Sequence, residues 1–157
     1  AKTAVKGEFT TLKIINPIES NTKQGVFENL GFEIPVSSFF SKNEARDTKI
    51  KKLFFGIMEE TNLISGGFSD VKGNSSTGTL TLKLKMNGNL VAVPMTYTIT
   101  DNTITIDGII ENLLDWKMET AFNSLHKACE ILHTGQDGVS KTWTDVKINA
   151  KAVLLQK

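Results

Sequence analysis

Apolar and polar residues alternate most regularly over residues 78–99, which read GTLTLKLKMNGNLVAVPMTYTI. In the first half of this stretch Leu and Met side chains share one face, while Thr and Lys share the other. Asn87-Gly88 then gives the strongest short-range signal for a tight turn, because both residues tolerate positive φ. In the second half, aliphatic residues from Val91 to Ile99 again share one face. The pattern predicts a β-hairpin with one apolar and one polar side.

Strand-like patterns also occur on both sides of this hairpin. They cover residues 5–15, 31–36, 63–71, 103–108 and 143–155. Pro35 lacks an amide donor, so it predicts an edge, a bulge or a strand end at that position. A second tight turn is predicted at Asp101-Asn102. Residues 16–31 combine loop formers with a few apolar residues, which indicates a loop with an anchored middle.

Two segments change to a helical period. The motif SKNE at 41–44 fits a capping box, in which the Ser41 hydroxyl caps the amide of Glu44. A short helix is therefore predicted over residues 45–55, with Gly56 as its C-cap. A longer helix is predicted from about Asp115 to His133, before the C-terminal strand.

These elements predict a mainly β protein with a single domain over residues 1–157, since no repeat or linker interrupts the chain. Amphipathic antiparallel strands must hide their apolar face against a second sheet or by closing on themselves. Long strands joined by hairpins favour an antiparallel β-barrel over a Greek-key sandwich. A barrel of about eight strands can be packed solid or can hold one small ligand. Because the inward residues are almost wholly aliphatic, a cavity here would accept an apolar ligand.

Composition narrows the classes of partner. The 18 Lys and Arg residues balance 17 Asp and Glu residues. The chain therefore lacks the surplus of basic residues that would predict a nucleic-acid partner. No run approaches the ~20 apolar residues of a membrane-spanning helix, and no signal peptide opens the sequence. A single cysteine, Cys129, excludes an internal disulfide and leaves the compartment undecided.

Three segments carry a family resemblance by their order and spacing. VKGEF at 5–9 resembles an early V-x-G-x-F strand, SSFFSKNEARDTKIKKLFF at 37–55 resembles a Ser-rich strand-to-helix segment, and residues 78–97 resemble a G-T-L-T hairpin. Together they resemble the bacterial YceI-like proteins, lipocalin-like barrels that carry polyisoprenoid lipids. The resemblance implies a lipocalin-like fold and a periplasmic or secreted location.

The resemblance also implies an apolar lipid ligand, polyisoprenoid, quinone-like or fatty-acid-like, bound or transported inside the barrel without catalysis and without a cofactor. Transient contact with a membrane would accompany such a role. The expected lining consists of Phe9, Leu12, Phe32, Ile34, Phe54, Phe68, Leu80, Leu82, Leu84, Val91, Val93, Met95, Ile104, Ile148 and Ala150.

Two departures from the family pattern bear on the architecture. The strand that usually precedes V-x-G-x-F is represented only by residues 1–4, so we expect either a barrel that lacks this strand or a trimmed chain. An absent first strand would leave an edge that a second copy could cover, as a homodimer. The helix predicted before the last strand is also longer than is typical, and it could cover a barrel mouth.

Other readings of the residues stay open. His126, Cys129 and His133 share one helix face at a spacing that suits zinc or copper, but no fourth ligand is evident, and a buried Cys beside helix-end histidines is the commoner outcome.

No Ser-His-acid set or phosphate loop indicates an enzyme. The main alternative function is a non-enzymatic interaction or stress-response module with a solid barrel core and its function on loops such as residues 16–31.

Overall fold

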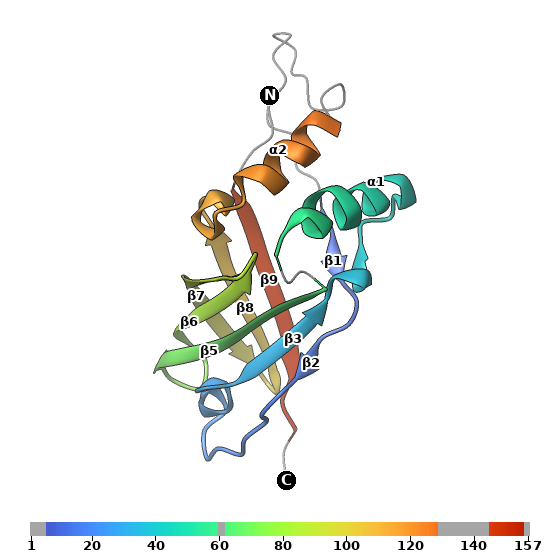
Figure 1. Ribbon diagram of the computed structural model, residues 1–157. Coiled ribbons are helices and arrows are strands. Elements are labelled where there is room, and N and C mark those ends of the chain that lie inside the picture. Colours follow the sequence, from blue (N-terminus) through green and yellow to red (C-terminus); the bar gives the residue numbers. More distant parts are fainter. Residues whose placement is uncertain (1–5, 60–61, 129–144, 156–157) are drawn as a thin grey trace, which may run out of the picture.

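A computed structural model describes residues 6–59, 62–128 and 145–155 (Figure 1). The main feature is one seven-stranded antiparallel sheet with the strand order β2-β3-β5-β6-β7-β8-β9. Its strands are β2 (Lys13–Ile14), β3 (Gly31–Pro35), β5 (Leu63–Gly73), β6 (Thr77–Met86), β7 (Asn89–Thr100), β8 (Thr103–Ile110) and β9 (Val146–Val153). The sheet curls into a half-barrel, as Figure 1 shows. The prediction of a mainly β, lipocalin-like antiparallel fold is therefore confirmed.

The β6–β7 hairpin forms as its sequence predicts. The two strands pair from Thr77 with Thr98 to Met86 with Asn89. Asn87 and Gly88 form the turn with φ values of 51° and 68°. Positive φ at both turn residues matches the right-handed twist of the strands that they join.

Pro94 marks the place where β7 parts from β8. β7 pairs with β6 on both sides of Pro94, but its pairing with β8 begins only at Met95. Proline has no N–H to donate, so a sheet tolerates it where one of the neighbouring ladders has ended.

The strand predicted over residues 5–15 is broken in two. β1 (Glu8–Phe9) pairs with β4 (Phe39–Phe40) in a separate two-stranded sheet, whereas β2 joins the edge of the main sheet. Gly7 lies against the ring of Phe39, where a Cβ atom would clash. Between Phe9 on β1 and Lys13 on β2, the chain passes from the two-stranded sheet to the main sheet.

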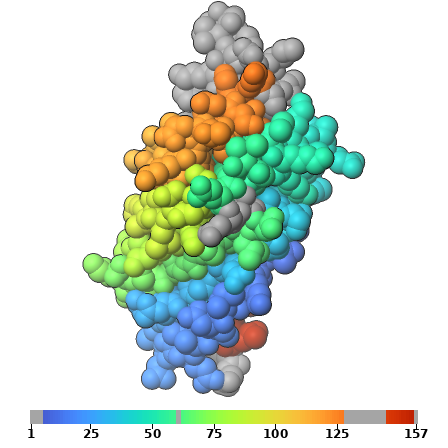
Figure 2. All heavy atoms as spheres, viewed as in Figure 1, coloured from blue at the N-terminus to red at the C-terminus, as the bar shows by residue number. Residues whose placement is uncertain are grey.

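Helical turns close one end of the half-barrel. Between β4 and β5 the chain forms α1 (Glu44–Lys49), a π-helical turn η3 (Ile50–Phe54) and a 3₁₀ turn η4 (Phe55–Ile57). Between β8 and β9 it forms η5 (Leu113–Trp116) and α2 (Glu119–Ala128). α2 contacts η3 and η4, and Figure 2 shows these segments side by side across this end of the molecule. A short helix after the early strands and a longer one before the last strand are both confirmed.

The capping box predicted for the first helix is wrong. Asn43 is the N-cap, and its side chain accepts a hydrogen bond from the Arg46 amide at 3.0 Å. Ser41 binds the side chain of Asp47 instead. Asn and Ser are almost equally good caps, so the sequence does not decide between neighbouring candidates.

The loop over residues 16–31 is anchored in its middle, as predicted. η1 (Gln24–Phe27) buries Phe27 against the sheet. The Glu28 carboxylate accepts hydrogen bonds from the amides of Asp70 and Val71 at 3.1 and 2.9 Å. The same two residues lie where the β5–β6 register shifts, and Asp70 has a φ of 54°. The loop thus stabilises an irregular point in β5.

Candidate functional site: the concave face of the sheet

The concave face is built by inward side chains that align across neighbouring strands. Leu82 lies opposite Phe68 on β5 and Val93 on β7, and Leu80 lies opposite Met95. Because side chains in a strand alternate between faces, every second residue of each strand joins this surface. The result is a continuous apolar face from β3 to β8.

Thirteen of the fifteen residues expected to line a cavity are buried or half-buried. Those with little exposure are Phe32, Phe54, Leu80, Leu82, Leu84, Val93, Met95 and Ile104, and those that are half-buried are Phe9, Ile34, Phe68, Val91 and Ile148. All but Phe9 and Phe54 lie on strands of the main sheet. Most of the predicted set therefore comes together on one surface.

Two residues of the expected lining do not belong to the buried surface. Leu12 precedes β2, outside any strand, and is 49% exposed. Ala150 lies on the same face of the sheet as its partner Ile106, but it is exposed because β9 is the last strand of the sheet. The alternation assigned Ala150 to the correct face, but it could not show that the sheet ends there.

Side chains from the helical segments complete the core over the concave face. Trp116 and Met118 are each 1% exposed, and Ala121 is 3% exposed. The indole Nε1 of Trp116 donates to the carbonyl oxygen of Leu84 on β6 at 2.7 Å. The Asn87 side chain in turn donates to the carbonyl oxygens of Trp116 and Lys117 at 3.1 and 2.9 Å. The approach to α2 is therefore fixed to the β6–β7 hairpin, and Trp116 is a packing anchor.

Two groups of phenylalanine rings pack within the core. In the first, Phe55 lies 5.1 Å from Phe54 and 6.0 Å from Phe9, measured between ring centroids. In the second, Phe68 lies 5.9 Å from Phe27 and 5.6 Å from Phe32. The Phe32–Phe68 contact is tilted and the other three are edge-to-face, and such contacts stabilise the rings beyond the burial of their area.

A polar cluster lies between β4 and α1. The buried Asp47 carboxylate accepts hydrogen bonds from the backbone amide of Ser41 at 3.1 Å and from its hydroxyl. Arg46 donates to the Ser41 hydroxyl and carbonyl oxygens at 3.0 and 2.8 Å. The hydrogen bond from the Ser41 hydroxyl is the main cause that lowers the pKa of Asp47 below its ordinary value. These groups satisfy one another, so the cluster fixes the start of α1.

The buried side chain of Tyr97 packs at the end of the sheet that contains the β5–β6 turn. Its side chain is 1% exposed, and its hydroxyl donates to the carbonyl oxygen of Asn74 at 2.7 Å. The ring lies over Gly78, its partner on β6. Burial raises the pKa of the Tyr97 hydroxyl, because desolvation disfavours the phenolate.

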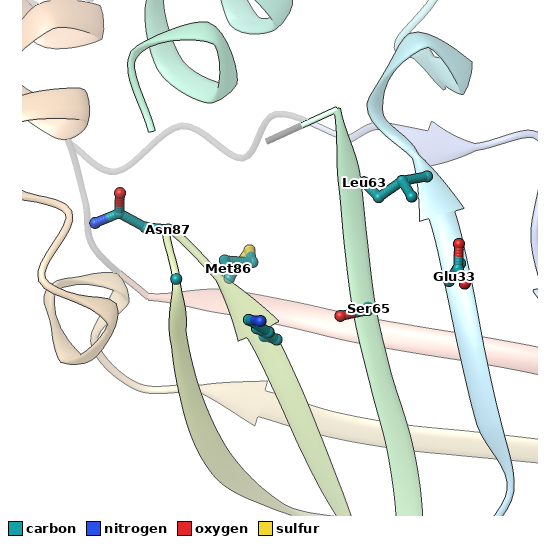
Figure 3. Close-up of a pocket in the computed structure, with 7 residues that line it drawn as sticks. Glu33, Leu63, Ser65, Met86 and Asn87 are labelled. Atoms are coloured by element: carbon teal, nitrogen blue, oxygen red, sulfur yellow. The ribbon is translucent and has the colours of Figure 1, made fainter. Parts of the chain in front are cut away.

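Two pockets lie away from the centre of the concave face. One of about 300 Å³ is lined by Glu33, Leu63, Ser65, Lys85, Met86, Asn87 and Gly88. In Figure 3 the labelled side chains of this pocket lie on β3, β5 and β6 and in the turn after β6, below the helical segments. A broader one of about 1040 Å³ crosses the outer surface of β5 to β9, where Thr79, Asp107 and Lys147 contribute to it. Three residues of the expected lining, Leu80, Met95 and Ile148, also border this second pocket.

The metal hypothesis falls mostly outside the described residues. His126 lies on α2, but Cys129 and His133 are not among the residues that the structure describes. Within the described ranges no group of three or more His, Cys, Asp or Glu side chains could hold a metal ion. In the same ranges no helix is both long and apolar enough to cross a membrane.

Several residues of the buried surface were absent from the expected lining. They are Ile64, Met86, Tyr97, Ile99, Ile106 and Ile110 on the strands, and Phe27, Leu30, Val36, Phe55, Met58, Trp116, Met118 and Ala121 elsewhere. The strand residues follow the same alternation as the expected ones. Of the others, Val36 continues the alternation of Phe32 and Ile34, and Ala121 belongs to the apolar stripe of its helix. The remaining ones carry no periodic signal that would place them over the sheet.

The curled antiparallel sheet with helical segments across one end is a lipocalin-like fold. The structure is similar to that of Campylobacter jejuni YceI, with a TM-score of 0.71 and 17% identity, covering 100% of this chain and 88% of that one. It is also similar to a polyisoprenoid-binding domain from Saccharophagus degradans implicated in plant cell wall breakdown, with a TM-score of 0.53 and 11% identity, covering 78% of this chain and 74% of that one. No family model and no curated protein matches the sequence. The chain thus has the YceI fold, and the resemblance noted in its sequence is confirmed at the level of the fold.

Proposed function

We propose that the protein binds an apolar lipid chain, of the polyisoprenoid, quinone-like or fatty-acid-like class, against the concave face of its sheet. The observation that carries the proposal is the continuous apolar surface formed by β3 to β8 and centred on Leu82. The similarity in fold to a polyisoprenoid-binding domain supports the same ligand class. Carriage of that lipid between membranes, in the periplasm or outside the cell, is part of the proposal.

Binding would rely on buried area and not on polar contacts. Among the described residues, Ser41 and Asp47 are the buried polar side chains outside the apolar core, and both are used to fix α1. Each CH₂ group that leaves water contributes about 0.8 kcal/mol. A few isoprene units would therefore offset the costs of association and of ordering the ligand. We propose binding without catalysis for this reason.

A bound chain would have to move side chains that now contact one another. Met86, Met95 and Met118 are all buried on or over the concave face. Methionine has three rotatable bonds and adapts its shape more readily than a branched or aromatic side chain. We expect these residues to shift first when the lipid enters.

The close packing of the core is also the observation that favours the alternative function. Leu80, Ile104 and Trp116 are each at most 3% exposed. A closely packed core of this kind is also what we expect of an interaction module whose interior binds no ligand and whose loops bind its partner. The two proposals differ in whether the concave face accepts a guest.

The test is a pair of tryptophan variants on neighbouring residues of β6. Leu82 points into the concave face and is 5% exposed, whereas Lys83 points to solvent. Uptake of geranylgeraniol is measured by isothermal titration calorimetry for the wild type, Leu82→Trp and Lys83→Trp. We expect Leu82→Trp to lose at least about tenfold in affinity, equivalent to 1.4 kcal/mol, and Lys83→Trp to bind like the wild type. Equal uptake by both variants contradicts the site, and no uptake by the wild type supports the solid scaffold.

A further inference from the structure

The edge of the sheet at β9 has no strand partner among the residues that the structure describes. β9 is the last strand in the order and pairs only with β8 among the described strands. The amide of Leu154 donates to the carbonyl oxygen of Asn102 at 2.6 Å, one residue beyond the pair Thr103–Val153. In an antiparallel ladder this places Val153, and every second residue before it, in non-hydrogen-bonded pairs with β8. Their N–H and C=O groups therefore turn toward the free edge.

The residues whose backbone N–H and C=O groups turn toward this edge have mostly polar or basic side chains. They are Lys147, Asn149, Lys151 and Val153, and the first three are exposed on the outer face of the sheet. On the inner face of β9, Ile148 is only half-buried, and Ala150 and Ala152 are exposed. The Asp107 carboxylate on β8 accepts a hydrogen bond from the Asn149 side chain at 2.6 Å, so the charges on the edge strand itself are those of the two lysines. Within the described part of the chain, the edge thus offers backbone hydrogen-bonding groups with lysines on its outer side and small apolar residues on its inner side.

The charges decide which strand fits this edge. A second copy of β9 would bring two more lysines and no carboxylate on its outer side. In the register centred on Asn149 it would place Lys147 of each copy directly opposite Lys151 of the other. Like charges that lie opposite each other destabilise a strand pair, and lysines on an edge are a known obstacle to self-association. A strand with acidic residues on its outer side meets no such obstacle.

We propose that the free edge of β9 accepts one extended segment of a different polypeptide, which pairs with β9 as an additional antiparallel strand. The segment has alternating residues, acidic on the outer side opposite Lys147 and Lys151, and apolar on the inner side next to Ala150 and Ala152. Backbone hydrogen bonds to an exposed sheet edge supply the affinity, and alternate side chains supply the specificity. This interaction surface adjoins the concave face, because Ile148 and Ala150 lie on the inner side of β9, but the proposal does not depend on lipid binding.

The test uses two fluorescein-labelled peptides and fluorescence anisotropy at low ionic strength. The acidic probe is Thr-Val-Glu-Val-Thr-Val-Glu-Val-Thr, and the basic probe has Lys in place of Glu. We expect the wild type to bind the acidic probe about tenfold more tightly than the basic one, with a smaller preference at 0.5 M salt. We expect the double variant Lys147→Glu, Lys151→Glu to reverse the preference. The double variant Lys72→Glu, Lys83→Glu makes the same change in net charge away from the edge and should keep the wild-type preference.

Asn149→Pro tests the backbone contribution. It removes an N–H that turns toward the edge and leaves the backbone hydrogen bonds to β8 in place, so circular dichroism should be unchanged while the binding of both probes is lost. Asn149→Ala controls for the hydrogen bond that the Asn149 side chain donates to the Asp107 carboxylate at 2.6 Å, and it should keep the wild-type binding. If Asn149→Pro disturbs the fold, the reversal by the double Glu variant still decides the question, because both lysines are exposed. The proposal is overturned if the wild type binds neither probe, binds both equally, or forms dimers that the double Glu variant abolishes.

Discussion

Tyr97 allows a direct test of the packing at the turn end of the sheet, because it is the single tyrosine of the chain. Its hydroxyl donates to the carbonyl oxygen of Asn74 at 2.7 Å, and its side chain is 1% exposed. Tyr97→Phe removes this hydrogen bond and leaves the carbonyl without that donor. The expected loss is about 1 kcal/mol in the free energy of unfolding, or about 2–4 °C in Tm for a chain of this size.

The pH dependence gives the same residue a second, independent readout. Burial raises the pKa of Tyr97 above its ordinary value of 10.0, so the folded state holds its proton more tightly than the unfolded state does. The stabilisation is complete below pH 10 and is lost as the pH rises through the folded pKa. Ultraviolet absorbance near 295 nm follows the single tyrosinate. We expect the native protein to titrate above pH 10 and the urea-unfolded protein to titrate near it.

Tyr97→Phe provides the control, because it lacks the tyrosine and keeps every other titratable group. The difference in urea midpoint between the wild type and Tyr97→Phe should shrink as the pH rises from 9 to 11. A native titration at or below pH 10, or a difference that does not change with pH, would refute the account of this residue. If circular dichroism shows that the wild type unfolds at the pH at which Tyr97 ionises, the result also agrees with this account of Tyr97.

Three further predictions concern the described hydrogen bonds and close contacts. Trp116→Phe removes the donor to the Leu84 carbonyl and should cost about 1–3 kcal/mol in urea unfolding followed by circular dichroism. Gly78→Ala places a Cβ atom against the backbone carbonyl oxygen of Lys72 and 2.5 Å from the Tyr97 ring, and should cost about 1–3 kcal/mol by the same measurement. Asp47→Asn should destabilise the protein at pH 7, but the difference from the wild type should shrink below pH 3.8, because the lowered pKa stabilises only the ionised form.

Each of these predictions has a result that would contradict it. A Trp116→Phe variant as stable as the wild type would show that the Leu84 carbonyl does not need this donor. A neutral Gly78→Ala change would show that both the Lys72 backbone and the Tyr97 ring can move aside. An Asp47→Asn difference that persists unchanged to pH 3 would mean that the charge of Asp47 does not contribute.

The alternation of side chains was sufficient to predict the central strands. The hairpin at Asn87-Gly88 and the inward placement of Leu80, Leu82 and Val93 all follow from it. Alternation reports which face a residue occupies, because the period of a strand is two residues. It does not report how the sheet ends, which is why Ala150 was placed on the correct face but in the wrong environment.

The parts that the sequence could not predict depend on contacts between distant segments. Residues 8–14 read as one strand, but they divide between two sheets because Phe9 pairs with Phe39 and Ile14 pairs with Phe32. Trp116 has no periodic pattern that would assign its indole to the carbonyl oxygen of Leu84. Such contacts join residues far apart in sequence, so no local pattern contains them.

The central claim is that the concave face accepts an apolar chain. Native mass spectrometry of the protein purified from its natural source, followed by solvent extraction, tests it most directly. The account predicts an adduct that the solvent removes and that carries a long hydrocarbon or isoprenoid chain. A mass equal to that of the polypeptide alone, together with no binding of added geranylgeraniol, would contradict it.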